Sequence, residues 1–261
     1  MRPFDFDNAI LRAPAPSVVD GLRAHDGPSP SFAGVVAEHQ AYAAALADAG
    51  VTVDMLPPLD DYPDSLFVED PALVFPEGAI MLRPGALSRI GETAYLRAAF
   101  DRHFASVTKI DEGHADGGDV LVTPDEVLIG LSSRTDRLGA AALAKALAEL
   151  GRKARIILPP EGALHLKTAV SLLDEETVLT TRAGAESDLF ADFRQLIVAD
   201  GEEAAANALR VNDRLFVGRQ FPETIRLLEN EGYDLVALDT RQIGLIDAGL
   251  SCMSLRWSGR S

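Results

Sequence analysis

The chain has little of several things that would point to particular classes of protein. Cys252 is the only cysteine in 261 residues, so no disulfide can form within the chain. No run approaches 18 apolar residues, and the N-terminus lacks the apolar core of a signal peptide. Basic residues are also few, 24 against 40 acidic ones, which gives a net charge of −16. Nucleic acids and anionic membranes are not expected as partners, because both require a positive surface. We therefore expect a soluble, cytoplasmic protein.

The lone cysteine lies in a stretch with the features of a nucleophile site. Residues 247–255 read DAGLSCMSL, so a small Ala-Gly turn leads to Cys252 and a short apolar run follows it. Such a turn holds a thiol rigidly while leaving it accessible, which suits nucleophilic catalysis. Free cysteines are also among the most buried residue types, so this stretch alone also allows a structural role. The remaining sequence must decide between the two.

The hydrophobic pattern repeats one unit five times: two strands, a helix and a third strand. Such repetition favours radial assembly, and no linker or low-complexity segment interrupts it. We therefore predict a single α/β domain over residues 1–261. The first unit is the least regular, with a strand at 9–11, a helix at 33–49 and a strand at 51–56. The later units have strands at 72–75, 79–82, 120–122, 127–130, 154–158, 169–173, 177–180, 195–198, 208–211, 214–217 and 234–238, with helices at 88–104, 136–150 and 221–231.

Polar clusters lie between these units, at equivalent places in the repeat. They are residues 64–70, 113–119 and 164–167, together with the turn at Cys252. In a radial fold equivalent segments converge near the axis, so carboxylates, an imidazole and a thiol would meet there. Taken singly each cluster also allows an ordinary structural role. A metal site built from His114, Asp116 and Asp119 is a further alternative, although their spacing matches no known site.

Several motifs together resemble dimethylarginine dimethylaminohydrolase, in the order in which that family carries them. The resemblance extends over residues 8–257 and implies a five-bladed α/β propeller of strand-strand-helix-strand units. The family belongs to a guanidine-modifying superfamily with arginine deiminases and amidinotransferases. The motifs are FVED at 67–70, RPGA at 83–86 with Ser88 and Arg89, DGGDVL at 116–121, GLSSRT at 130–135, LHLK at 164–167 and SC at 251–252.

The resemblance also implies a role for individual residues. Cys252 matches the nucleophile, His165 the general acid and base, and Asp116 the carboxylate that orients the site. The residues that match substrate-binding positions are Glu69 and Asp70 near the guanidinium, Asp64, Arg89 and Arg134 at the amino-acid end, Phe67 as a packing wall, and Ile246 through its backbone carbonyl.

These roles predict a cysteine-dependent hydrolase that converts an Nω-methylated L-arginine to L-citrulline and a methylamine. The cationic guanidino substrate would be its partner; no metal or organic cofactor is required, and a homodimer is possible. Arginine deiminase activity, or hydrolysis of another guanidino acid, is the nearest alternative. A catalytically inactive protein that binds arginine-like ligands is the alternative from another class. One departure concerns the N-terminal lid, where Ala13 or Ala15 aligns with a leucine of the family.

Overall fold

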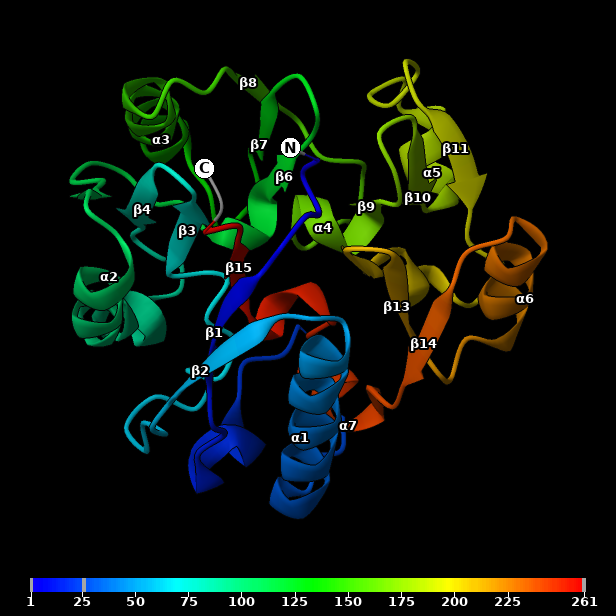
Figure 1. Cartoon of the computed structure of the whole chain (residues 1–261), viewed down its shortest axis with the longest axis horizontal. Coiled ribbons are helices and arrows are strands. Elements are labelled where there is room, and N and C mark those ends of the chain that lie inside the picture. Colours follow the sequence, from blue (N-terminus) through cyan, green and yellow to red (C-terminus); the bar gives the residue numbers. More distant parts are fainter. Residues whose placement is uncertain (1, 25–26, 260–261) are drawn as a thin grey trace.

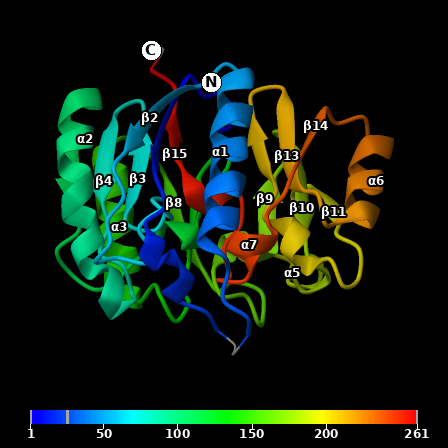
Figure 2. The same ribbon diagram turned by 90° about the horizontal axis from the view of Figure 1, so that it is seen from below.

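The computed structural model describes residues 2–24 and 27–259, and it contains five three-stranded sheets. The sheets surround a common centre like the blades of a propeller, with helices on the outside (Figure 1). Seen from below, α2 and α6 lie at opposite edges and the strands lie between them (Figure 2). The predicted five-bladed α/β propeller is confirmed.

Every blade has the same topology, in which a central strand pairs antiparallel with one neighbour and parallel with the other. The parallel connection requires a crossover, and in each blade a helix supplies it. The blades are β15-β1-β2 (Leu255–Trp257, Asn8–Arg12, Thr52–Leu56), β3-β4-β5 (Ala72–Phe75, Gly78–Met81, Val107–Lys109), β6-β7-β8 (Val120–Val122, Val127–Gly130, Ala154–Ile157), β9-β10-β11 (Val170–Leu172, Thr177–Thr180, Arg194–Ile197) and β12-β13-β14 (Leu209–Val211, Arg214–Gly218, Leu235–Leu238). The crossover helices are α1 (Phe32–Asp48), α2 (Arg97–His103), α3 (Arg137–Glu149), α5 (Arg182–Glu186) and α6 (Pro222–Asn230).

Local sequence explains where these elements begin and end. The side chain of Ser31 caps α1 by accepting a hydrogen bond from the backbone N–H of Gly34, and Asp136 caps α3 in the same way. Gly50 follows α1 with a positive φ of 86°, which is favourable for glycine. The central strand β7 is buried along its whole length, because strands are packed against it on both edges and helices or other blades cover its faces.

The helix expected over residues 88–104 differs from the prediction. It is a 3₁₀ segment over Leu87–Leu96 that continues as α2. Ala86 occupies the N-cap position, so Ser88 is not a cap. The segment instead brings Arg89 and Glu92 into the interior, where both side chains are buried.

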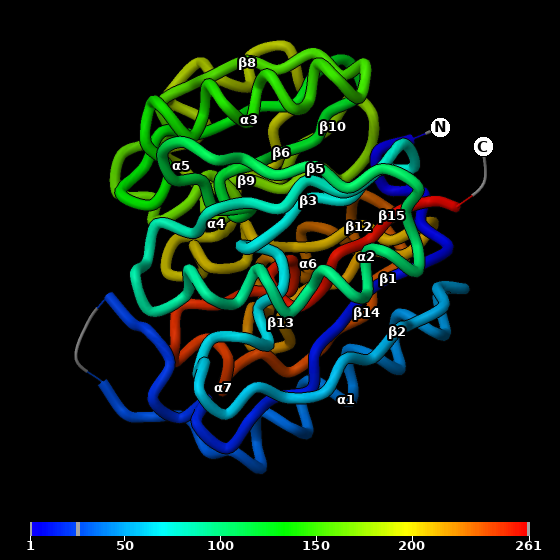
Figure 3. Tube along the Cα trace, turned by 90° about the vertical axis from the view of Figure 1, so that its left-hand side faces the viewer, coloured from blue at the N-terminus to red at the C-terminus, as the bar shows by residue number. Residues whose placement is uncertain are grey.

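The first blade contains a strand that the repeat pattern did not predict. β15 follows the Cys252 turn and pairs antiparallel with β1, with Ile10 opposite Leu255. The two strands lie side by side although nearly the whole chain separates them (Figure 3). This pairing closes the ring and gives the first blade its third strand.

Three further helical segments carry residues of the polar clusters, and the first is the 3₁₀ turn η3 (Gly117–Asp119). α4 (Leu166–Ala169) begins directly after His165, and a 3₁₀ turn, η5 (Ser251–Met253), contains Cys252. Among the described residues, no helix is long and apolar enough to cross a bilayer.

Candidate active site

The predicted site residues come together around one cavity of about 110 Å³. All of them except Asp116 and Glu69 contribute to its wall. The lining residues from the predicted set are Asp64, Phe67, Asp70, Arg89, Arg134, His165, Ile246 and Cys252. Segments from the ends of several blades thus converge at one place, as the radial arrangement requires.

Cys252 is presented by η5, immediately before β15. The backbone N–H of Gly249 donates a hydrogen bond to its Sγ over 3.4 Å. Burial raises the pKa of the thiol to about 12, and the negative charges of Glu69 and Asp70 act in the same direction. In the ligand-free protein the sulfur is therefore a neutral thiol at physiological pH.

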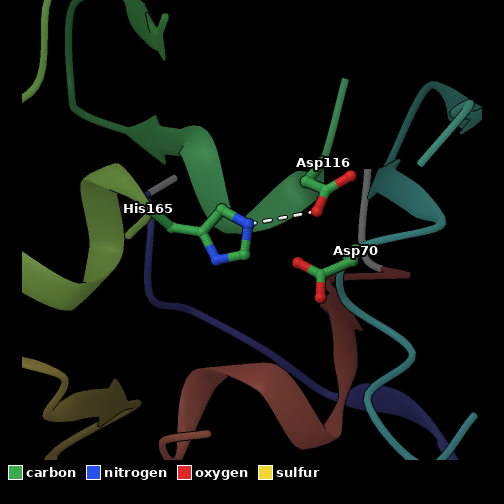
Figure 4. Close-up of side chains that lie close together, drawn as sticks. All are labelled: Asp70, Asp116 and His165. Atoms are coloured by element: carbon green, nitrogen blue, oxygen red, sulfur yellow. Dashed lines mark hydrogen bonds and ion pairs between the residues drawn. The ribbon is translucent and has the colours of Figure 1, made fainter. Parts of the chain in front are cut away.

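His165 and Asp116 form a buried pair (Figure 4), with 3.1 Å between Nε2 and Oδ2. Asp116 is fully buried, and its other oxygen accepts a hydrogen bond from the backbone N–H of Gly85 over 2.8 Å. Burial on its own would lower the pKa of His165. The hydrogen bond to Asp116 and the charges of Asp70 and Asp119 outweigh it and raise the pKa to about 9. The imidazole is therefore protonated at neutral pH and can act as a general acid.

Gly118 is required beside this pair. A Cβ atom at that position would lie 2.8 Å from the His165 ring and 2.9 Å from a carboxylate oxygen of Asp70. Its backbone N–H donates to the Oδ1 of Asp70 over 3.0 Å. The absence of a side chain therefore allows the imidazole and the Asp70 carboxylate to approach each other (Figure 4).

Asp70 is ionised and held in place by Arg89, whose Nη1 forms an ion pair with its Oδ2. Burial would raise the pKa of Asp70, but the positive charges of Arg89 and His165 lower it overall. Arg89 also donates to Glu92 and to the backbone carbonyls of Asp64 and Phe67. Its guanidinium lines the cavity but is already surrounded by acceptors from the protein.

Arg134 differs from Arg89 in its surroundings. Its side chain is 22% exposed, and its Nη1 lies 4.0 Å from the Oδ2 of Asp116. Ile246 and Phe67 are buried on the cavity wall. A ligand in the cavity therefore meets a comparatively open cation at Arg134 and apolar surface at Ile246 and Phe67.

The lid lies at a different position from the one expected. Ala15 is buried, whereas Leu22, Arg23 and Ala24 line the cavity. The shift arises because β1 continues to Arg12 and a 3₁₀ segment over Pro16–Asp20 packs inward before the chain reaches the cavity. The alignment of Ala13 or Ala15 with the lid leucine is therefore wrong, and a leucine does face the site.

Two carboxylates tie this lid to the cavity wall. The Oδ1 of Asp64 accepts a hydrogen bond from the N–H of Leu22 over 2.9 Å, and the Oδ2 of Asp247 accepts one from Ala24. Burial raises the pKa of Asp64 despite the nearby charge of Arg89. In this structure Asp64 therefore contacts the lid as well as the cavity.

Glu69 points away from this cavity. Its carboxylate lines a second, larger cavity of about 230 Å³. There it meets the Nζ of Lys167 at 2.5 Å, the Oγ of Ser251 at 2.8 Å and the Nη2 of Arg256 at 3.3 Å. The two acidic neighbours in the FVED motif lie in a turn and thus face different cavities.

Sequence reasoning missed Asn207, Arg256 and Glu92, which are buried or partly buried close to the predicted residues. Arg256 could have been suspected, because it is a charged residue between Leu255 and Trp257 in an apolar run. Asn207 and Glu92 lie in segments without a recognisable motif, so the sequence carries no comparable signal for them.

The metal site considered from the sequence is not formed by His114, Asp116 and Asp119. In the described part of the chain, the group with suitable spacing is Asp70, Asp116 and His165, whose ligand atoms lie within 4.8 Å of one another. Asp119 instead accepts hydrogen bonds from the hydroxyls of Ser132 and Thr135 and from the N–H of Leu166.

The ionised carboxylate of Asp70 also suits an organic cation such as a guanidinium. The two oxygens of a carboxylate can accept hydrogen bonds from the N–H groups of that planar cation.

Known proteins resemble this chain in sequence and in structure. Residues 57–211 match the sequence model of the arginine deiminase family. N(G),N(G)-dimethylarginine dimethylaminohydrolase from Pseudomonas aeruginosa is 35% identical over 254 residues, which cover 97% of this chain and all of that protein. The enzyme of the same name from Streptomyces coelicolor is 34% identical over 250 residues, or 95% of this chain and 96% of that protein.

Solved structures agree with these sequence matches. The Pseudomonas aeruginosa protein, as a cysteine-to-serine variant complexed with citrulline, superposes with a TM-score of 0.93 over 97% of this chain and 100% of that chain, at 35% identity. The N-terminal domain of ArgZ, covalently bound to a reaction intermediate, gives a TM-score of 0.83 over 97% of this chain and 98% of that one. At 19% identity the second match shows a common fold.

Proposed function

This chain belongs to the dimethylarginine dimethylaminohydrolase family, and we propose that it hydrolyses Nω-methylated L-arginine to L-citrulline and a methylamine. The observation that carries the proposal is the convergence of Cys252, His165 and Asp70 on one cavity. A nucleophile, a protonated acid and an ionised carboxylate are the groups that hydrolysis of a guanidinium requires. Citrulline is the ligand named in the structure of the Pseudomonas aeruginosa relative.

The reaction begins with binding of the guanidinium against Asp70. Charge-assisted hydrogen bonds to the carboxylate fix the planar cation and place its central carbon near the Sγ of Cys252. The cation also lies beside the thiol, where its positive charge offsets the charges that hold the thiol pKa high. Substrate binding therefore favours release of the thiol proton to solvent and formation of the nucleophile, since His165 already carries its proton.

His165 then moves protons at both stages. The thiolate adds to the guanidinium carbon, and the imidazolium protonates the methylated nitrogen as its bond to carbon breaks. A covalent S-alkylthiouronium and the free amine result. The neutral imidazole next accepts a proton from water, whose oxygen attacks the same carbon. The C–S bond breaks, citrulline leaves and the thiol is regenerated.

The amino-acid end of the substrate is proposed to contact Arg134, Asp64 and the Ile246 carbonyl. Arg134 is the more available cation for the α-carboxylate, because the protein itself satisfies most of the Arg89 guanidinium. Arg89 then acts on the substrate chiefly by fixing Asp70. Phe67 contributes an apolar wall to the cavity.

The pKa values of the two catalytic groups predict an alkaline activity profile. The reaction needs the thiolate together with the imidazolium, and kcat/KM reports the free enzyme. Below pH 9 His165 keeps its proton, so the active fraction rises about tenfold per pH unit as more thiolate forms. Above pH 9 loss of the imidazolium proton offsets the further gain in thiolate, so kcat/KM levels off. We expect this shape from initial rates between pH 6 and 10; a maximum below pH 7 would contradict the proposed protonation states.

A panel of guanidino substrates tests the function. Monomethylated and asymmetrically dimethylated L-arginine, L-arginine, agmatine and methylguanidine are each assayed for the ureido product and the released amine. We expect the methylated arginines to give the highest kcat/KM. The match to the arginine deiminase family favours L-arginine as the second candidate, in which case ammonia would be the main amine released. Absence of a ureido product from every compound would favour hydrolysis of another guanidino acid or the binding-protein alternative over the proposed activity.

A further inference from the structure

Ser251, the residue before the proposed nucleophile, has each of its polar atoms hydrogen-bonded to Asn207, Glu69 or Arg256. Its N–H donates to the Oδ1 of Asn207 over 3.0 Å. Its Oγ donates to the Oε2 of Glu69 over 2.8 Å and receives a bond of 3.2 Å from the Nδ2 of Asn207. Its carbonyl accepts from the Nη1 of Arg256 over 3.1 Å. The turn that carries Cys252 is thereby fixed on three sides.

The holding residues are themselves buried and connected. Glu69 is 3% exposed and bridges Lys167 and Arg256. The Nη1 of Arg256 also donates to the carbonyl of Ser254 over 2.8 Å, so one guanidinium spans the two ends of the turn. The backbone N–H of Glu69 donates to the carbonyl of Cys252 itself over 3.2 Å. Buried networks of this kind stiffen the segment that they bind, although the Nε of Arg256 has no hydrogen-bond partner here.

Asn207 also controls the donor that contacts the sulfur. The side chain of Asn207 packs against Gly249, where an added Cβ would lie 2.4 Å from its Cγ. The N–H of Gly249 is the group that donates to the Sγ of Cys252. Asn207 therefore fixes both the residue before the nucleophile and the hydrogen-bond donor to the nucleophile.

We propose that Glu69, Asn207 and Arg256 are positioning residues that act through Ser251 to hold the Sγ of Cys252 in line with the guanidinium carbon. This inference rests on the proposed function, because it assumes that Cys252 is the nucleophile. It assigns Glu69 to the support of the turn, whereas the family resemblance places it beside the guanidinium. Glu69 faces the larger cavity, away from the space that a substrate would fill. A displacement of about 1 Å at a reacting atom can lower a rate on the order of 10²-fold.

The first test uses Ser251→Ala and Arg256→Lys, alone and combined. Each change removes contacts to the turn without altering the cavity that binds substrate. We expect kcat to fall roughly tenfold in each single variant, with KM within about twofold of the original. Because both changes act on the same turn, the double variant should lose less than the product of the two single losses. The assay uses whichever guanidine of the panel the unmodified protein turns over fastest.

Matched controls separate positioning from general destabilisation. Ser187→Ala removes a serine hydrogen bond to the Gly184 carbonyl, and Arg155→Lys alters an exposed ion pair with Glu126. Neither residue lines the cavity, so both variants should keep kcat. Glu69→Gln adds a specific readout, because loss of a substrate ligand would raise KM whereas loss of a positioning residue lowers kcat. A large rise in KM with unchanged kcat would overturn the proposal.

Hydrogen exchange tests the contacts that Glu69, Asn207 and Arg256 make to Ser251, here called the clamp, without any substrate. Backbone amides of residues 249–253 should exchange at least severalfold faster in Ser251→Ala than in the unmodified protein, and Ser187→Ala should leave them unchanged. This measurement is informative even if no methylated arginine is hydrolysed, so failure of the clamp and failure of the proposed function are distinguishable. Unchanged exchange and unchanged kcat in the Ser251 and Arg256 variants would show that the turn holds its position without these contacts.

Discussion

Replacing Cys252 by serine is expected to lower kcat roughly 10⁶-fold, the order of loss seen when a catalytic nucleophile is removed. A serine hydroxyl has a far higher pKa than a thiol, and the negative charges of Glu69 and Asp70 oppose ionisation still further. His165 cannot act as the base for that hydroxyl, because its imidazole is already protonated at neutral pH. The variant therefore lacks both a nucleophile and a means of generating one.

Binding should survive this substitution, since Asp70 and Arg134 remain in place. Calorimetric titration of a methylated arginine into Cys252→Ser should give a dissociation constant within a few-fold of the KM of the unmodified protein. Thermal unfolding supplies the control, because serine fills nearly the same volume as cysteine. Residual turnover of more than about one per cent would argue against a cysteine mechanism. Loss of cooperative unfolding would instead favour a structural role for Cys252.

Replacing His165 by alanine is expected to lower kcat roughly 10³-fold, in the middle of the range for removal of a general acid and base. The effect should be largest on the second stage, in which water must be deprotonated to release the product. Intact-protein mass spectrometry of the quenched reaction should therefore detect protein carrying the thiouronium adduct. The adduct mass must correspond to the substrate minus its methylamine.

Two further variants show whether this effect belongs to the imidazole. Asp116→Asn keeps His165 but removes the charge that helps to hold it protonated, so we expect a smaller loss, on the order of 10²-fold. His103→Ala removes a histidine that pairs with Asp54 on the outer surface and should have no effect. If His165→Ala turns over without accumulating adduct, another group must activate the water.

The fold could largely be predicted from the sequence, because the hydrophobic pattern repeats. The strands of the later units lie at nearly the predicted positions, except that β5 (Val107–Lys109), the third strand of the second unit, has no counterpart among the predicted ranges. The predicted helices at 136–150 and 221–231 agree closely with α3 and α6. β15 was missed because it is only three residues long and has Arg256 at its centre. Its pairing partner is β1, at the other end of the sequence, and no local pattern can reveal such a contact.

The candidate site was less predictable where side-chain direction decides the role. Glu69 and Asp70 are adjacent in the sequence, and only the packing of the blades shows that they face different cavities. The interaction of Arg89 with Glu92 and two backbone carbonyls depends on a 3₁₀ segment where a regular helix was expected. The lid was misplaced because its register depends on how residues 13–20 pack, and that stretch has no motif.

The closure of the ring by β1 and β15 has a consequence for the order of events during folding. Four blades consist of strands that are neighbours in sequence, so they can form from contacts of moderate range. The first blade needs Ile10 to meet Leu255, and bringing distant segments together is entropically costly and slow. The Cys252 turn leads directly into β15, so the placement of Cys252 depends on the pairing of β15 with β1. We therefore expect the candidate site to become complete only when this long-range contact forms.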